Sequence, residues 1–182
     1  MSKRTFFIIL FAVICLLSVN AEQVVDLYAF TDLALIQSAF ISHLYCSAGI
    51  GATVEKELSI EIPVSLYADT GGGNEILLES SVNVVVFPWS CGPYISLSLI
   101  DLIAFLGDYA PKDSIHYLST IAFGYNWEVN DRWAVSPRVT IHDPSVMYEE
   151  TLSYIRGFIP TFPKVSFSLY IRYSFAKLSA ET

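Results

Sequence analysis

The chain has 182 residues, 53% of them hydrophobic, and a formal net charge of −8 at pH 7. This length favours a single domain. The acidic balance argues against nucleic acid as a partner, because binding to phosphates needs clustered Lys and Arg. Cys46 and Cys91, the two cysteines outside the amino-terminal segment, lack metal-ligand spacing. We therefore expect no disulfide framework, no metal site and no cofactor.

The amino-terminal segment has the three parts of a secretory signal peptide. Lys3 and Arg4 form a basic start, an apolar run extends from Thr5 to Val19, and the small residue Ala21 ends the segment. This order predicts cleavage after Ala21. Removing the two cations changes the net charge from −8 to −10. The alternative, an uncleaved membrane anchor, stays open.

The segment Lys164 to Phe175 has the clearest two-faced pattern. Apolar residues occupy every second position from Val165 to Phe175, and mostly small polar residues occupy the positions between them. Side chains of a strand alternate between its two faces, so this segment is predicted to be a strand with one apolar face. Its length matches the roughly 9–11 residues of a tilted strand that crosses a membrane.

Seven further segments show the same alternation. They cover residues 23–30, 40–54, 58–68, 76–86, 94–104, 117–128 and 133–142. The first is weak, and the alternation in 94–104 is less clear. Residues 31–38 fit a helical turn as well as an extension of the first strand.

The connections between these segments differ in length. They are short at 55–56, 88–93 and 130–131, and longer at about 31–39, 69–74, 107–114 and 143–163. An even number of strands, with short turns at one rim and longer loops at the other, is the layout of an outer-membrane barrel. We therefore predict an all-β fold, an eight-stranded antiparallel up-and-down transmembrane β-barrel over 22–175, with a short tail over 176–182.

A soluble, lipocalin-like barrel would show the same alternation with its apolar rows facing inward. The polar rows favour the membrane alternative, because they carry few charges, unlike a face in contact with water. The tryptophans also favour the membrane alternative, because they lie in or beside short turns, and aromatic residues concentrate at membrane boundaries. The predicted periplasmic girdle consists of Trp89, Trp127, Trp133, Tyr173 and Phe175.

Together these features resemble the small eight-stranded outer-membrane proteins of the OmpA, OmpX and OmpW type. The resemblance covers most of the mature chain and concerns its architecture. It implies a bacterial outer-membrane location, contact with outer-membrane lipid, and recognition of Lys164 to Phe175 by the assembly machinery. In that family the last strand ends the chain on an aromatic residue, whereas here seven residues follow Phe175.

Eight strands enclose an interior barely wide enough for their own side chains. The charged residues on the inward rows are Glu61, Glu79, Glu128, Arg138 and Arg172. We predict that they pair in a structural network, because an unpaired buried charge is costly. A gate or binding site on the same residues is the alternative hypothesis. The inward apolar positions Leu77 and Leu118, with Val85 and less clearly Ile100 and Leu102, suit an apolar pocket. Equally, these side chains could only fill space in the lumen.

We expect a structural or surface-interaction role and no enzymatic activity. The resemblance to the OmpW type implies an alternative, a conduit for small hydrophobic molecules that uses the pocket at Leu77 and Leu118. A second alternative is a lipid A-modifying enzyme, since His142, Asp143 and Ser145 are close in sequence. Sequence neighbours do not make a triad, because triad members must meet in space. We assign no catalytic residue.

Overall fold

The computed structural model describes residues 24–34, 43–55, 57–69, 76–89, 92–106 and 116–179. The expected signal peptide, Cys91 and the last three residues of the expected tail lie outside this part of the chain. The described elements are β1 (Val24–Leu33), β2 (His43–Glu55), β3 (Leu58–Asp69), β4 (Ile76–Val86), β5 (Gly92–Leu106), β6 (His116–Tyr117), β7 (Thr120–Glu128), β8 (Trp133–His142), α3 (Glu149–Phe158) and β9 (Val165–Ser179).

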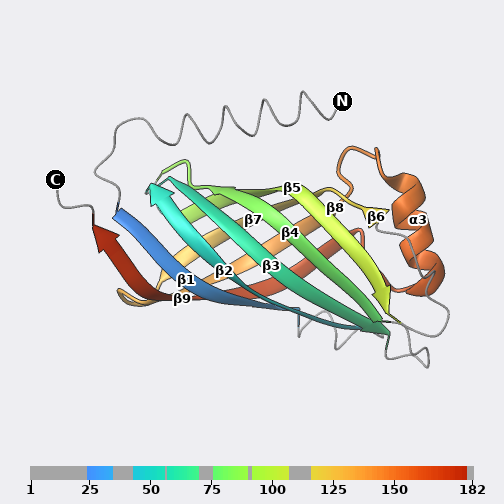
Figure 1. Cartoon of the computed structure of the whole chain (residues 1–182), viewed down its shortest axis with the longest axis horizontal. Helices are drawn as coiled ribbons and strands as arrows, with labels where there is room; N and C mark the ends of the chain where they lie inside the picture. The colour runs from blue at the N-terminus through green and yellow to red at the C-terminus, as the bar shows by residue number, and fades with distance from the viewer. Residues whose placement is uncertain are drawn as a thin grey trace.

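The strands close into a ring in which each pairs antiparallel with its neighbours. Their order is β4-β3-β2-β1-β9-β8-β7-β5, and pairing between β4 and β5 joins the two ends of this row. The first and last strands, β1 and β9, lie side by side (Figure 1). The short β6 pairs with β5 beyond the end of β7, so β6 and β7 share one position in the ring. The prediction of a closed, eight-stranded antiparallel barrel is confirmed.

The two ends of the barrel differ, as the lengths of the connections predict. The turns β2–β3, β4–β5 and β7–β8 lie at the same end as the start of β1 and the end of β9, at the left of Figure 1. We call this end the short-turn rim. Helix α3 lies at the opposite end, at the right of Figure 1, which we call the long-loop rim.

The interior of the barrel is largely polar and its outer wall is apolar. On β4, every second residue is buried. The buried set is Leu77, Glu79, Ser81, Asn83 and Val85. Large apolar side chains such as Ile50, Val64 and Phe167 are instead exposed on the outer face. A water-soluble barrel has the reverse arrangement, whereas a membrane barrel has this one.

Glycines on the inner face make room for aromatic rings in the narrow interior. A Cβ atom at Gly51 would overlap the ring of Tyr28, and one at Gly124 would overlap the ring of Tyr94. Glycine within a strand often marks such a close approach. The small residues of the polar rows are therefore needed for packing against aromatic side chains of neighbouring strands.

A bulge in β5 corrects the faces predicted for two of its residues. The pairing of β5 with β4 shifts by one residue between Ser98 and Ile100. One extra residue moves every following side chain to the other face of the sheet. Asp101 and Ile103 are therefore buried, whereas Leu102 is exposed. The expectation that Ile100 and Leu102 face inward was wrong.

Two elements extend beyond the sequence prediction. β9 continues to Ser179, four residues past Phe175, and the added residues pair with β1. The connection 143–163, expected to be a loop, contains α3. No helix in the described part of the chain is long and apolar enough to cross a membrane.

Candidate functional site

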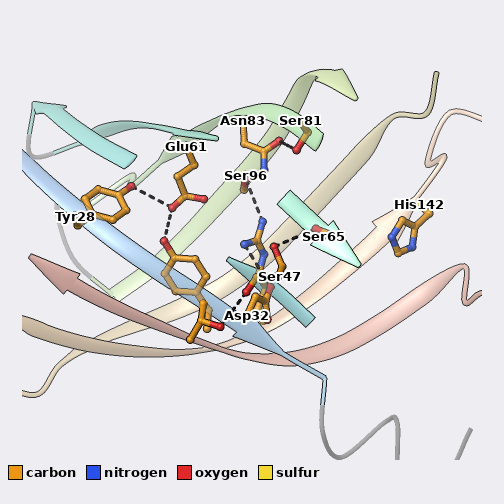
Figure 2. Close-up of polar contacts among 12 residues, drawn as sticks. Tyr28, Asp32, Ser47, Glu61, Ser65, Ser81, Asn83, Ser96 and His142 are labelled. Atoms are coloured by element: carbon orange, nitrogen blue, oxygen red, sulfur yellow. Dashed lines mark hydrogen bonds and ion pairs between the residues drawn. The ribbon is translucent and has the colours of Figure 1, made fainter. Parts of the chain in front are cut away.

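The middle of the lumen contains a buried carboxylate that two tyrosines share. Glu61 lies on β3, Tyr28 on β1 and Tyr170 on β9, and all three are buried. Tyr28 Oη and Tyr170 Oη donate hydrogen bonds to Glu61 Oε1, at 3.1 Å and 2.6 Å (Figure 2). Hydrogen bonds to an ionised acceptor are among the stronger ones. This contact ties β3 to the junction where β1 and β9 close the barrel.

Arg138 on β8 makes the second polar contact across the lumen. Its guanidinium lies 3.6 Å from Asp32 Oδ2 on β1 and donates to Ser96 Oγ at 3.4 Å. It also lies 5.6 Å from the centre of the Tyr170 ring. The predicted network lacks Asp32, because the sequence of residues 31–38 fits a helical turn as well as an extension of the first strand. In the structure β1 continues through Asp32 and places its side chain inside the barrel.

Two other members of the predicted network are placed differently. Arg172 lies 5.0 Å from the centre of the Tyr28 ring, a cation–π contact, and forms no ion pair with a described carboxylate. Glu128 follows the inward alternation of β7, but it is the last residue of the strand and is exposed. The expectation of a buried Glu128 in the lumen was therefore wrong, because a strand end at the rim is open to solvent.

Glu79 and Asp101 form an acidic pair closer to the long-loop rim. They lie on the neighbouring strands β4 and β5, both are buried, and their carboxyl groups interact with each other. No described residue donates a hydrogen bond to either oxygen of Asp101 or to Glu79 Oε2. The alternation of β5 does not predict Asp101 inside the barrel, because the bulge in β5 moves it to the inner face.

Polar side chains line a small cavity in the lumen. Its volume is about 30 Å³, and Asp32, Ser65, Glu79 and Arg138 are among its lining residues. This is space for about one water molecule. A solute cannot pass through a cavity of this size without rearrangement of the side chains around it.

The connection 143–163, which we call the cap, closes the long-loop rim with an apolar contact. Four side chains of the cap pack against four of the barrel: Leu152, Ile155, Ile159 and Phe162 against Tyr67, Leu77, Ile103 and Leu118. The predicted pocket residues Leu77 and Leu118 thus belong to one cluster, which side chains of the cap fill. Val85 lies elsewhere, in a cluster with Phe87 and Tyr94.

His142 and Asp143 lie where the cap begins. His142 is buried, and its Nε2 lies 3.3 Å from Tyr67 Oη. Asp143 is also buried, has a positive φ of 48°, and accepts a hydrogen bond from the Tyr148 N–H. Ser145 is exposed in the following turn. The imidazole and the carboxylate therefore contact residues that hold the cap in place.

The five residues of the predicted girdle lie at or near the short-turn rim. Trp89, Trp127, Trp133 and Phe175 are exposed by 69%, 60%, 45% and 56%. The ring of Tyr173 packs against Trp133, with 4.7 Å between the ring centres. Their exposure at one end of an apolar wall matches the position of a membrane boundary.

The described residues contain no group of three or more His, Cys, Asp or Glu side chains that could hold a metal ion. Cys46 is a free, half-buried thiol. The lumen contacts described above are hydrogen bonds, the Asp32–Arg138 ion pair and aromatic contacts.

No family model and no curated protein matches the chain. Among solved structures, the N-terminal β-barrel domain of OprF from Pseudomonas aeruginosa aligns with a TM-score of 0.48 and 11% identity, over 86% of this chain and 100% of that one. A barrel described under de novo design of transmembrane β-barrels aligns with a TM-score of 0.45 and 11% identity, over 86% of this chain and 98% of that one. At this identity the likeness concerns the fold alone.

Proposed function

We propose that the protein is a small β-barrel of a bacterial outer membrane, delivered by its amino-terminal signal peptide and surrounded by lipid. The distribution of side chains supports this location, because Ile50, Val64 and Phe167 are exposed on the outer wall while Glu61 and Ser81 are buried inside. Apolar area left in water costs roughly 25 cal/mol per Å². A lipocalin-like soluble barrel would need its apolar rows on the inside.

Within the membrane, the best-supported role is structural or surface-interacting, as the resemblance to the OmpA and OmpX type implies. The observation that carries this proposal is a lumen filled at two levels. Polar contacts around Glu61 and Arg138 occupy the middle, and the cap covers the long-loop rim. With the lumen filled, the outer wall and the loops are the surfaces that remain for function.

Heat-modifiability tests the membrane location, and liposome swelling tests whether the lumen is filled. We expect the detergent-folded protein to show a sheet circular-dichroism spectrum and to migrate differently on a gel before and after boiling. Liposomes that contain it should swell in sugar solution no faster than empty ones, with a general porin as the positive control. Folding in water without detergent would contradict the membrane location. Swelling at the rate of the porin would contradict the filled lumen.

A conduit for small hydrophobic molecules, as in the OmpW type, is the second candidate. The observation in its favour is that Leu77 and Leu118 lie in one apolar cluster beneath the cap. If the cap moved, this cluster would offer an apolar surface to a ligand. For a conduit, Leu77→Phe should reduce cellular uptake of a long-chain fatty acid, whereas Ser145→Ala in the exposed turn should not. Equal uptake by both variants favours the structural role.

The proposed partner in assembly is the outer-membrane assembly machinery, which would bind β9. Phe167, Leu169 and Phe175 are exposed along its outward row, as a strand signal requires. Catalysis, including modification of lipid A, has the least support, because His142 is buried beneath the cap.

A further inference from the structure

The outer wall has a groove along β8. It encloses about 650 Å³, which lies within the range of about 300–1,000 Å³ typical of small-molecule sites. Its lining includes Phe123 and Tyr125 on β7 and Phe167 and Leu169 on β9. Large side chains therefore stand on both sides of the groove.

The strand register explains why a groove forms there. Val139 on β8 pairs with Phe123 on one side and with Phe167 on the other. Pro137, two residues earlier, pairs with Leu169. Smaller side chains thus form the floor between rows of larger ones. The apolar outward row of β8 determines this shape, because residues two apart share a face.

The walls of the groove carry no charge. Arg138 lies between Pro137 and Val139 and borders the groove, but its guanidinium is inside the barrel, against Asp32 and Ser96. A polar head group would find no ion pair here. The groove therefore suits a ligand that is apolar along its whole length.

We propose that this groove binds one acyl chain of a membrane lipid more tightly than the rest of the outer wall does. The proposal rests on the membrane location proposed above, since the groove is continuous with the apolar outer wall. Within a bilayer the hydrophobic effect gives no preference, so packing contacts decide which chains stay bound. A chain between Phe123 and Phe167 is contacted on three sides, whereas a chain on a flat wall is contacted on one.

Photolabelling with a lipid that carries a diazirine on its acyl chain tests the proposal. The protein is folded into phosphatidylethanolamine-containing bilayers with this lipid, irradiated and digested, and labelled peptides are quantified by mass spectrometry. Labelling of each segment in urea-unfolded protein corrects for intrinsic reactivity. We expect several-fold more label on the groove walls of β7 and β9 than on β3, where Ile62 and Val64 are exposed.

Two matched variants make the result specific. Val139→Trp should fill the groove and reduce labelling of β7 and β9 to the level of β3. Val64→Trp, the same change on another part of the outer wall, should leave the labelling of the groove unchanged. Both positions lie on the outer face, so we expect both variants to keep the heat-modifiable fold.

The results of this experiment distinguish acyl-chain binding in the groove from the proposed membrane location. Equal labelling of all outward segments would contradict preferential binding of an acyl chain in the groove, but not the membrane location. A folded protein without label on any segment would overturn both. Protection of β7 and β9, together with dimers after treatment of the same sample with a bifunctional protein crosslinker, would show that a second copy of the chain, and not lipid, occupies the groove.

Discussion

At the scale of single residues, the shared carboxylate Glu61 makes the clearest prediction. Tyr170 donates to it at 2.6 Å inside the barrel. Tyr170→Phe removes this hydrogen bond to a charged group and should lower the free energy of unfolding by about 1.5–3 kcal/mol. Urea titration of the barrel in lipid vesicles measures the change. Tyr173→Phe, on the outward row of the same strand, is the control, and equal losses from both variants would contradict the assigned role.

Arg138 makes a second prediction. Arg138→Met leaves Asp32 buried without its cation, which costs about 3–5 kcal/mol when one partner of a buried pair is removed. Adding Asp32→Asn should restore much of this loss, because a neutral amide is easier to bury than a carboxylate. Arg132→Met at the exposed rim should change the unfolding midpoint little. No restoration by Asp32→Asn would mean that the pair does not stabilise the barrel.

Period-two alternation assigns a face to a residue but does not identify its partner. The alternation predicts that Glu61 faces the interior, and Glu61 is buried there in the structure. The hydrogen-bond donors of Glu61, Tyr28 and Tyr170, lie 33 and 109 residues away in sequence. Contacts this distant follow from closure and stagger of the barrel. Glu128 shows the other limit, since alternation cannot say where a strand leaves the barrel wall.

At the scale of elements, the helix in the cap was missed although its signal is in the sequence. Leu152, Ile155 and Ile159 are three and four residues apart, the spacing of one helix face. These three residues, together with Phe162, pack onto the barrel. Pro144, Pro160 and Pro163 all lie outside α3. The bulge in β5 could not be predicted, because one extra residue leaves the composition of the strand unchanged.

The packing of α3 predicts how the cap can be released. Ile155→Asp places a charge in the apolar cluster and should detach the helix while the barrel remains heat-modifiable. Trypsin should then cleave after Arg156 several-fold faster, since an unfolded segment fits a protease better than a packed helix. Ser153→Asp, on the exposed side of α3, is the matched control. Unchanged cleavage of the Ile155 variant would contradict the contact between cap and barrel.

The extension of β9 predicts the effect of shortening the chain. Ala176 pairs with Leu27 and Lys177 with Asp26, so these residues help to close the barrel. A chain that ends at Phe175 should fold in vesicles more slowly and unfold at lower urea concentration, because this ladder is lost. A chain that ends at Ser179 keeps the ladder and should match the full-length protein. Equal behaviour of the two truncations would mean that the closure needs no residue beyond Phe175.

At the scale of the whole molecule, the sequence was sufficient for the architecture. Eight two-faced segments with alternating short and long connections predict a closed barrel, and β1 pairs with β9 as that prediction requires. The state of the lumen was harder to predict, because it depends on side-chain volumes from all strands at once. The interior is small, two polar contacts cross it, and the cap covers one end. The barrel therefore has two successive barriers to a solute or ion that would pass through the lumen.

These two barriers lead to a prediction for ion conduction, measured as single-channel current in planar bilayers. The wild-type protein should give no current steps. Ile155→Asp should stay silent as well, because the contacts of Glu61 and Arg138 still fill the middle of the lumen. Adding Tyr170→Ala removes the ring that contacts both of them and should produce steps. Steps from Ile155→Asp alone would mean that the cap is the only barrier and that the polar contacts leave a path for ions.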